Sequence, residues 1–135
     1  MISLIESLPS GVSVCHGDPN PNNIIVSQGE YKLIDWVNSG VGNPMYDIAE
    51  YIWMYTPKEE TNFEGVSQAL IDFYLDKKDL IIPAFINAYE KLSGQELPSC
   101  EPYILPLLVR KLHSNRTEEE KSDIVIEIRD RLSKL

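Results

Sequence analysis

The pattern of apolar and polar residues changes one third of the way along the chain. In the first third, short alternating segments bounded by Pro, Gly and Asn predict β-strands over residues 12–16, 23–27 and 31–35. The last two segments flank a Gln-Gly-Glu sequence at residues 28–30, which is typical of a hairpin turn. This part of the chain is therefore predicted to form a small β hairpin region.

After the strand region, the apolar residues recur at helical spacing. The Asn-Pro pair at 43–44 is a cap followed by a first-turn proline, and the first predicted helix runs from it to the breaker Pro57. Apolar residues on one helical face mark a second helix within residues 66–74 and a third within residues 82–92. Gly94 is predicted to end the third helix.

Two further helices are predicted near the C-terminus. The segment 104–113 is apolar nearly all round in its first two turns, which predicts a central position in the core. Thr117 and Glu120 form a capping box at the start of the last helix. Its predicted buried stripe consists of Val125, Ile128, Leu132 and Leu135. The predicted fold class is α+β, mainly α, with a small β hairpin region packed on a helical bundle.

The composition is that of an ordinary globular domain. The chain has 135 residues, of which 43% are hydrophobic and 24% charged, so it can bury a core and is predicted to be a single domain over residues 1–135. Twelve basic and 21 acidic residues give a net charge of −9. This balance argues against binding to nucleic acid or to an anionic membrane surface, and it is compatible with a cationic partner.

The lack of a signal-peptide pattern and the isolated cysteines predict a cytoplasmic protein. The first residues lack the basic and apolar regions of a signal peptide, and no apolar stretch approaches the length of about 20 residues that a membrane span needs. Cys15 and Cys100 are far apart in the sequence and belong to no metal-ligand motif, so both are predicted to be reduced.

Two aspartates lie at the ends of predicted strands, where chemistry is often placed. Asp18 follows the first strand and Asp35 ends the third, and hairpin geometry is expected to bring them together. The intervening loop contains Asn20, Asn22 and Asn23, whose side chains offer amide oxygens. Carboxylate and amide oxygens together suit a hard cation such as Mg²⁺.

The same segment allows three other interpretations. An EF-hand loop fails, because Asn23 stands where that loop needs Gly and Gly29 stands where it needs Glu. A pair of carboxylates could also serve glycoside hydrolysis, which stays a remote alternative because nothing else indicates a sugar-binding groove. Taken singly, Asn20 and Asn22 are more typical of turn formers bonded to the local backbone.

Three motifs in order carry a family resemblance. His-Gly-Asp at residues 16–18 is followed by Asn23, then by Ile-Asp-Trp at 34–36 and by Gly-Asn-Pro-Met-Tyr-Asp-Ile-Ala at 42–49. Together they resemble the catalytic core of the aminoglycoside phosphotransferase and choline kinase family, whose members are relatives of the protein kinases. The resemblance is closest over residues 12–56, and it implies a kinase-like C-terminal lobe.

The resemblance implies roles for five residues. Asp18 is the expected catalytic aspartate, which orients the acceptor hydroxyl and accepts its proton. Asn23 and Asp35 are expected to bind Mg²⁺ and, through it, the phosphates of ATP or another nucleoside triphosphate. His16 is expected to be buried behind the aspartate, and Asp47 is expected to accept hydrogen bonds from the backbone of the catalytic loop.

The sequence also departs from the family pattern. Val37 stands where the family often has an acidic residue, and no Gly-rich loop, strand lysine or paired helix glutamate precedes the catalytic segment. The chain is therefore expected to be a truncated C-terminal catalytic lobe from which the N-terminal nucleotide-binding lobe is absent. Nucleotide binding by this lobe alone is expected to be weak or absent.

Two functions follow from the resemblance. The first is an ATP-dependent small-molecule kinase that phosphorylates a hydroxyl acceptor. The net charge of the chain is compatible with a cationic acceptor, for which Glu90, Glu96 and Glu101 are candidate partners. The alternative is a non-catalytic binding or assembly module that forms a homodimer through the surface the N-terminal lobe normally covers.

Aromatic residues near the motifs fit core packing better than a cage for a quaternary amine; they are Trp36, Tyr46, Tyr51, Trp53 and Tyr55.

Overall fold

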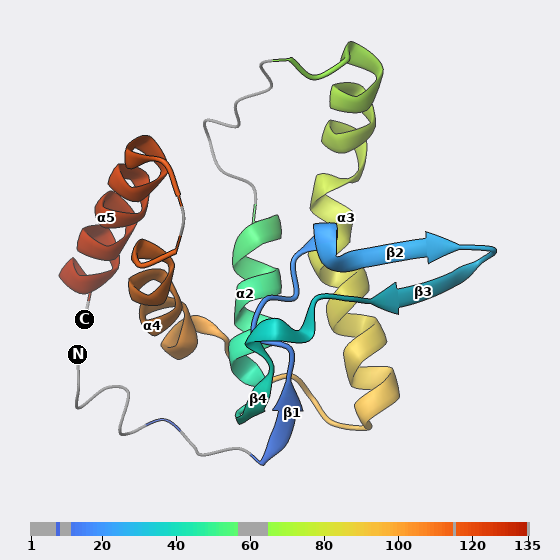
Figure 1. Cartoon of the computed structure of the whole chain (residues 1–135), viewed down its shortest axis with the longest axis horizontal. Helices are drawn as coiled ribbons and strands as arrows, with labels where there is room; N and C mark the ends of the chain where they lie inside the picture. The colour runs from blue at the N-terminus through green and yellow to red at the C-terminus, as the bar shows by residue number, and fades with distance from the viewer. Residues whose placement is uncertain (1–7, 9–11, 57–64, 115, 135) are drawn as a thin grey trace. The chain divides into compact units, whose positions relative to one another are not determined.

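A computed structural model describes residues 8, 12–56, 65–114 and 116–134 (Figure 1). The described residues form four α-helices, two short 3-10 helices and two small sheets. The chain has two compact units, of which one comprises Met1–Tyr51 with Cys100–Leu135 and the other Ile52–Ser99. The predicted class, α+β and mainly α, is confirmed.

The predicted hairpin is present in the first unit. Strands β2 (Ile24–Ser27) and β3 (Glu30–Leu33) pair in antiparallel fashion. Gln28 and Gly29 form the turn with φ values of 53° and 80°, and positive φ at both positions matches the right-handed twist of the strands. Glu30 therefore belongs to the strand, although the sequence pattern placed it in the turn.

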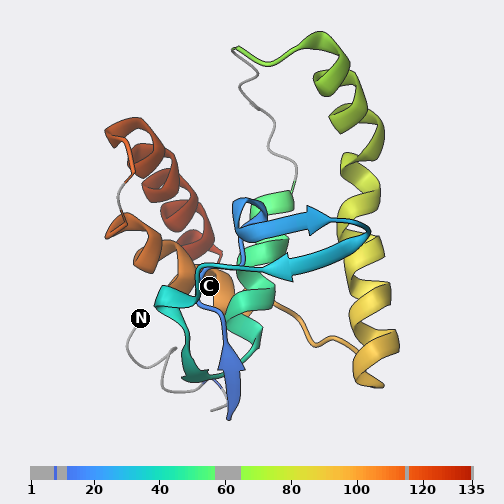
Figure 2. The ribbon, with the colours of Figure 1, turned by 45° about the vertical axis from the view of Figure 1, so that its right-hand side comes forward.

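A second sheet joins β1 (Ser13–Cys15) to β4 (Gly40–Gly42). The sequence pattern did not predict β4, because two glycines in a three-residue strand leave no alternating signal. Figures 1 and 2 show the hairpin extending away from this pair. Asp18 and Asp35 are therefore not the two ends of one hairpin. Instead, the return of the chain through β4 brings the segment after Asp35 beside β1, which precedes Asp18.

Helix α2 (Met45–Tyr55) begins at the predicted cap, where the Asn43 side chain accepts a hydrogen bond from the Met45 N–H at 2.9 Å. On its predicted apolar face, Ile48 is buried and Tyr51 is half-buried. The expected stop at Pro57 lies outside the described residues.

Helix α4 (Glu101–Leu112) supplies the centre of the core, as predicted. Leu107 and Leu108 are fully buried there. The rest of the apolar core of this unit comes from three helices and the residue before α4: Met45, Ile48, Ala49, Cys100, Tyr103, Ile104, Leu105, Ile124 and Ile128.

Helix α5 (Glu118–Ser133) lies beside α4 and begins with the predicted capping box of Thr117 and Glu120 (Figure 1). Its buried stripe differs from the prediction. Ile128 is buried, but Ile124 is the other buried residue and Leu132 is 44% exposed, while Leu135 lies outside the described residues. The buried face of α5 is thus shifted towards Ile124, while Val125 of the predicted stripe is half-buried.

In the second unit, one continuous helix replaces the two predicted ones. Helix α3 (Gln68–Ser93) contains Pro83 and ends at Gly94, whose φ is 69°. The separation was wrong because residues 75–81 contain no glycine or proline that could end a helix. Although α3 has 26 residues, neither it nor any other helix of the described ranges combines the length and apolar character of a membrane span.

Candidate active site

The tight turn of the His-Gly-Asp motif follows β1 directly. Gly17 has a φ of 81°, and a Cβ atom at this position would lie only 2.3 Å from the backbone oxygen of Asn38. A larger residue is therefore excluded both by the backbone conformation and by the neighbouring 3-10 helix, Trp36–Asn38. The motif needs its glycine so that Asp18 can be presented next to the segment that follows Asp35.

Asp47, in the first turn of α2, holds the backbone of this turn. Its Oδ2 accepts a hydrogen bond from the His16 N–H at 2.5 Å, and its Oδ1 accepts one from the Gly17 N–H at 3.0 Å. A carboxylate is also favourable at the N-terminus of a helix. The expected hydrogen bonds from the loop backbone to Asp47 are confirmed, and they anchor the residue before Asp18.

His16 links the two halves of the site from behind. Its side chain is only 3% exposed, which confirms the expected burial. Nδ1 accepts a hydrogen bond from the Asp18 N–H at 3.3 Å, and Nε2 lies 2.8 Å from the carbonyl oxygen of Ile34. Because a carbonyl oxygen can only accept, Nε2 carries the proton in this arrangement. The ring thereby connects the backbone of Asp18 to the residue before Asp35.

Asn23 is the second connection between the two segments. It is 8% exposed, and its Nδ2 donates to the backbone oxygen of Asp18 at 2.9 Å. Its own backbone oxygen accepts from the Ile34 N–H at 2.8 Å. Since the amide nitrogen is used for Asp18, the amide oxygen is the atom with which Asn23 can bind a cation.

Asp35 follows immediately after Ile34 and adopts a left-handed conformation with a φ of 60°. Such a conformation is uncommon for a non-glycine residue and is found at functional sites. The described residues contain no cluster of three or more His, Cys, Asp or Glu side chains suited to a metal. The Asn23 amide and the Asp35 carboxylate are nevertheless hard oxygen donors, and they fit Mg²⁺, which keeps other positions for water and phosphate.

Asp18 lies at the edge of a cavity, with 32% of its side chain exposed. Its Oδ1 is 3.7 Å from Nζ of Lys111. Burial alone raises the pKa of Asp18, but the hydrogen bond from Asn20 and the charge of Lys111 outweigh it, so the pKa lies below its usual value. The carboxylate is therefore ionised at neutral pH and can accept a proton.

A charged cluster behind Asp18 was missed in the sequence. Glu50 of α2 has a fully buried side chain that accepts hydrogen bonds from Lys111 Nζ and from Arg110 Nη2, the latter at 2.5 Å. Burial raises the pKa of Glu50, although the hydrogen bond and charge of Lys111 act in the opposite direction. One signal was available, because Lys111 is three residues after Leu108 and so lies on the buried face of α4.

The cavity next to Asp18 has a volume of about 430 Å³. It is lined by the His-Gly-Asp turn, the 3-10 helix after Asp35 and the C-terminal end of α4: Gly17, Asp18, Asn38, Arg110, Lys111, His113 and Ser114. A volume of this size can hold a small molecule beside the Asp18 carboxylate.

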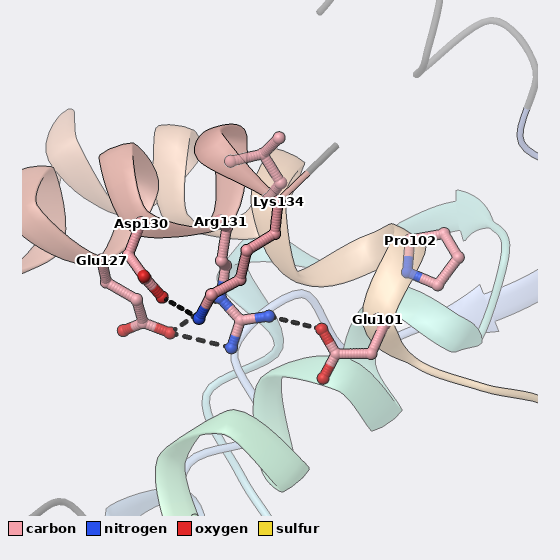
Figure 3. A pocket seen from close by; sticks show the side chains of 7 residues that line it. Glu101, Pro102, Glu127, Asp130, Arg131 and Lys134 are labelled. Carbon is pink, nitrogen blue, oxygen red and sulfur yellow. Dashed lines mark hydrogen bonds and ion pairs between the residues drawn. The ribbon is translucent and has the colours of Figure 1, made fainter.

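The three glutamates considered as partners of a cationic acceptor lie outside the lining of this cavity. Glu90 and Glu96 belong to the second unit, where Glu90 accepts a hydrogen bond from the Leu97 N–H at 2.9 Å. Glu101 lines a different cavity of about 550 Å³ between α4 and α5, and it pairs there with Arg131 (Figure 3).

The mainly α fold and the hydrogen-bonded motifs from His16 to Asp47 are compatible with the phosphotransferase class that the sequence resembles. Comparison with family models supports this class, because the model of the phosphotransferase enzyme family matches residues 3–103. The chain belongs to this family, and the resemblance noted in the sequence is confirmed. A search of solved structures found no match to the chain.

Proposed function

We propose that the chain is the catalytic lobe of an ATP-dependent phosphotransferase that phosphorylates a hydroxyl group of a small molecule. One observation carries the proposal: His16 and Asn23 connect the backbone of Asp18 to the segment that ends in Asp35. The proposed base and the proposed cation ligands thus belong to one hydrogen-bonded unit, which catalysis by positioning requires.

In this proposal, Asp18 orients the acceptor hydroxyl and accepts its proton. The acceptor oxygen forms a bond to the γ-phosphorus as the bond between that phosphorus and the departing ADP oxygen breaks. Asn23 and Asp35 would hold Mg²⁺, which offsets the negative charge of the phosphates when bound. His16 and Asp47 fix the backbone on both sides of Gly17, so the carboxylate keeps its orientation during the reaction.

The test measures ATP binding, with and without Mg²⁺, from the change in the midpoint of thermal unfolding. ATP at about 100 times its Kd stabilises the folded protein by about 2.7 kcal/mol, which raises the midpoint by several degrees. We expect this shift to disappear with EDTA and in Asp35→Ala, and to persist in the control Asp123→Ala, whose residue is exposed on α5. A Mg²⁺-dependent shift of full size in Asp35→Ala would show that the metal assignment is wrong.

A second candidate function, a non-catalytic assembly module, is favoured by exposed apolar residues in both sheets. Val14 of β1 and Val41 of β4 are register partners and are 73% and 75% exposed. A pair of this kind favours burial against another surface. We therefore expect the chain to sediment as a homodimer that Val41→Lys converts to a monomer. A monomer at all concentrations would contradict this candidate.

A further inference from the structure

The cavity beside Asp18 has an unusual charge balance for a chain with a net charge of −9. Among its lining residues, Asp18 is the only acid, whereas Arg110 and Lys111 are both cationic. The ligand environment of this cavity is therefore more positive than the protein as a whole. Since short-range charges dominate recognition in a confined site, the lining is a better guide to the ligand than the net charge.

The acid behind the cavity balances this excess only while Asp18 is ionised. Glu50 is fully buried, lies outside the lining, and carries a single charge that it shares between Arg110 and Lys111. Once Asp18 has accepted the proton of a hydroxyl group, one positive charge remains unbalanced. A buried acid of this kind holds both cations in place along the cavity wall, which prepares them for a ligand.

Arg110 is the cation best placed to contact a ligand. Its side chain is 48% exposed, whereas that of Lys111 is 11% exposed and lies close to both Glu50 and Asp18. The bond to Glu50 uses one terminal nitrogen of Arg110, and other N–H groups of the planar guanidinium can still donate. A guanidinium binds carboxylates and phosphates through two parallel hydrogen bonds.

We propose that the acceptor of the phosphoryl group carries an oxyanion, a carboxylate or a phosphate, and that Arg110 binds it while Asp18 binds the hydroxyl. The proposal rests on the proposed phosphotransferase function, because it identifies this cavity as the acceptor site. Arg110 lies beyond residues 3–103, where the family model matches, so the inference depends on the α4 helix of this chain. It favours an anionic acceptor over the cationic one with which the net charge is compatible.

The experiment measures binding of four small hydroxyl compounds to the full chain by NMR titration, without nucleotide. The probes are glycerate, glycerol 3-phosphate, glycerol and choline, which are a carboxylate, a phosphate, a neutral compound and a cation. We expect both anions to bind at least about tenfold more tightly than glycerol and choline. The stronger of the two anions identifies the source of the oxyanion. Equal binding of all four, or preferential binding of choline, would overturn the proposal.

Variants assign the selectivity to Arg110. Arg110→Gln is expected to lower anion affinity by at least about tenfold, and Arg110→Lys is expected to recover part of it because the charge returns without the planar fork. Arg129→Gln makes the same charge change at an exposed position of α5 outside the cavity lining and is expected to have no effect. Thermal unfolding of each variant verifies that it is folded. Unchanged anion binding in folded Arg110→Gln would refute the assignment.

A final measurement separates the acceptor site from the phosphate site of the nucleotide. Glycerate is titrated again in the presence of a saturating non-hydrolysable ATP analogue with Mg²⁺, and we expect both to be bound together. Displacement of glycerate by the analogue would mean that Arg110 binds nucleotide phosphate, which contradicts the proposal. Anion selectivity without phosphotransfer to any probe would instead count against the proposed function, because the binding data do not depend on turnover.

Discussion

Two cavities of the same unit differ in how their charges are balanced. The larger, of about 550 Å³, lies between α4 and α5, where Arg131 pairs with Glu101 and Glu127 and Lys134 pairs with Asp130 (Figure 3). These pairs are at least partly exposed, and each cation has an acid of its own. Such pairs contribute little free energy, and with three acids to two cations they leave no excess positive charge for an anion.

The smaller cavity, of about 430 Å³, is organised around a completely buried carboxylate. Glu50 holds two cations, and one of them, Lys111, lies 3.7 Å from the carboxylate of Asp18. Burying the charges of Glu50 and Lys111 costs free energy that a hydrophobic cluster would not cost. The larger volume and the buried charge thus belong to different cavities, and Asp18 lines the cavity beside the buried charge.

The two cavities are expected to differ most in the free energy of unfolding that is lost when one acid is replaced in each. Glu50→Gln removes the buried partner of Lys111 and should lower the free energy of unfolding by about 3–5 kcal/mol. Glu127→Gln, in the larger cavity, should lower it by less than about 1 kcal/mol because that pair is partly exposed. Urea unfolding followed by circular dichroism measures both values.

A double variant sharpens this comparison. Glu50→Gln combined with Lys111→Met removes both members of the buried pair, so it should recover more than half of the stability lost in the single variant. If the double variant is as unstable as the sum of both single variants, Glu50 stabilises the protein through contacts other than the pair.

A smaller effect is expected where a carboxylate anchors the catalytic loop. Asp47→Asn weakens the two hydrogen bonds to His16 and Gly17, and hydrogen bonds to a charged group contribute about 1.5–3 kcal/mol. We expect a loss of this order in stability, and a lower kcat because Asp18 follows the released segment directly. Asp130→Asn, in the larger cavity, should change stability by only about 0.5 kcal/mol and leave kcat unchanged. Wild-type kcat in folded Asp47→Asn would show that the loop needs no anchor.

Much of the candidate site could be predicted from the sequence because it lies within one short stretch. The motifs from His16 to Asp47 follow one another in order, and the burial of His16 and the hydrogen bonds of Asp47 were expected from them. The charged cluster could not be predicted in the same way. Glu50 and Lys111 are separated by 61 positions, and each is unremarkable in its own helix until the other is placed beside it.

The sequence by itself determined the local features: the β2–β3 hairpin, the capping box at Thr117 and the end of α3 at Gly94. These features depend on turn and cap chemistry between residues close in the chain. Only the tertiary structure decided which face of α5 is buried, that Gly40–Gly42 pairs with β1, and that Glu50 receives two cations. These outcomes depend on contacts between distant segments, where packing and desolvation outweigh local preference.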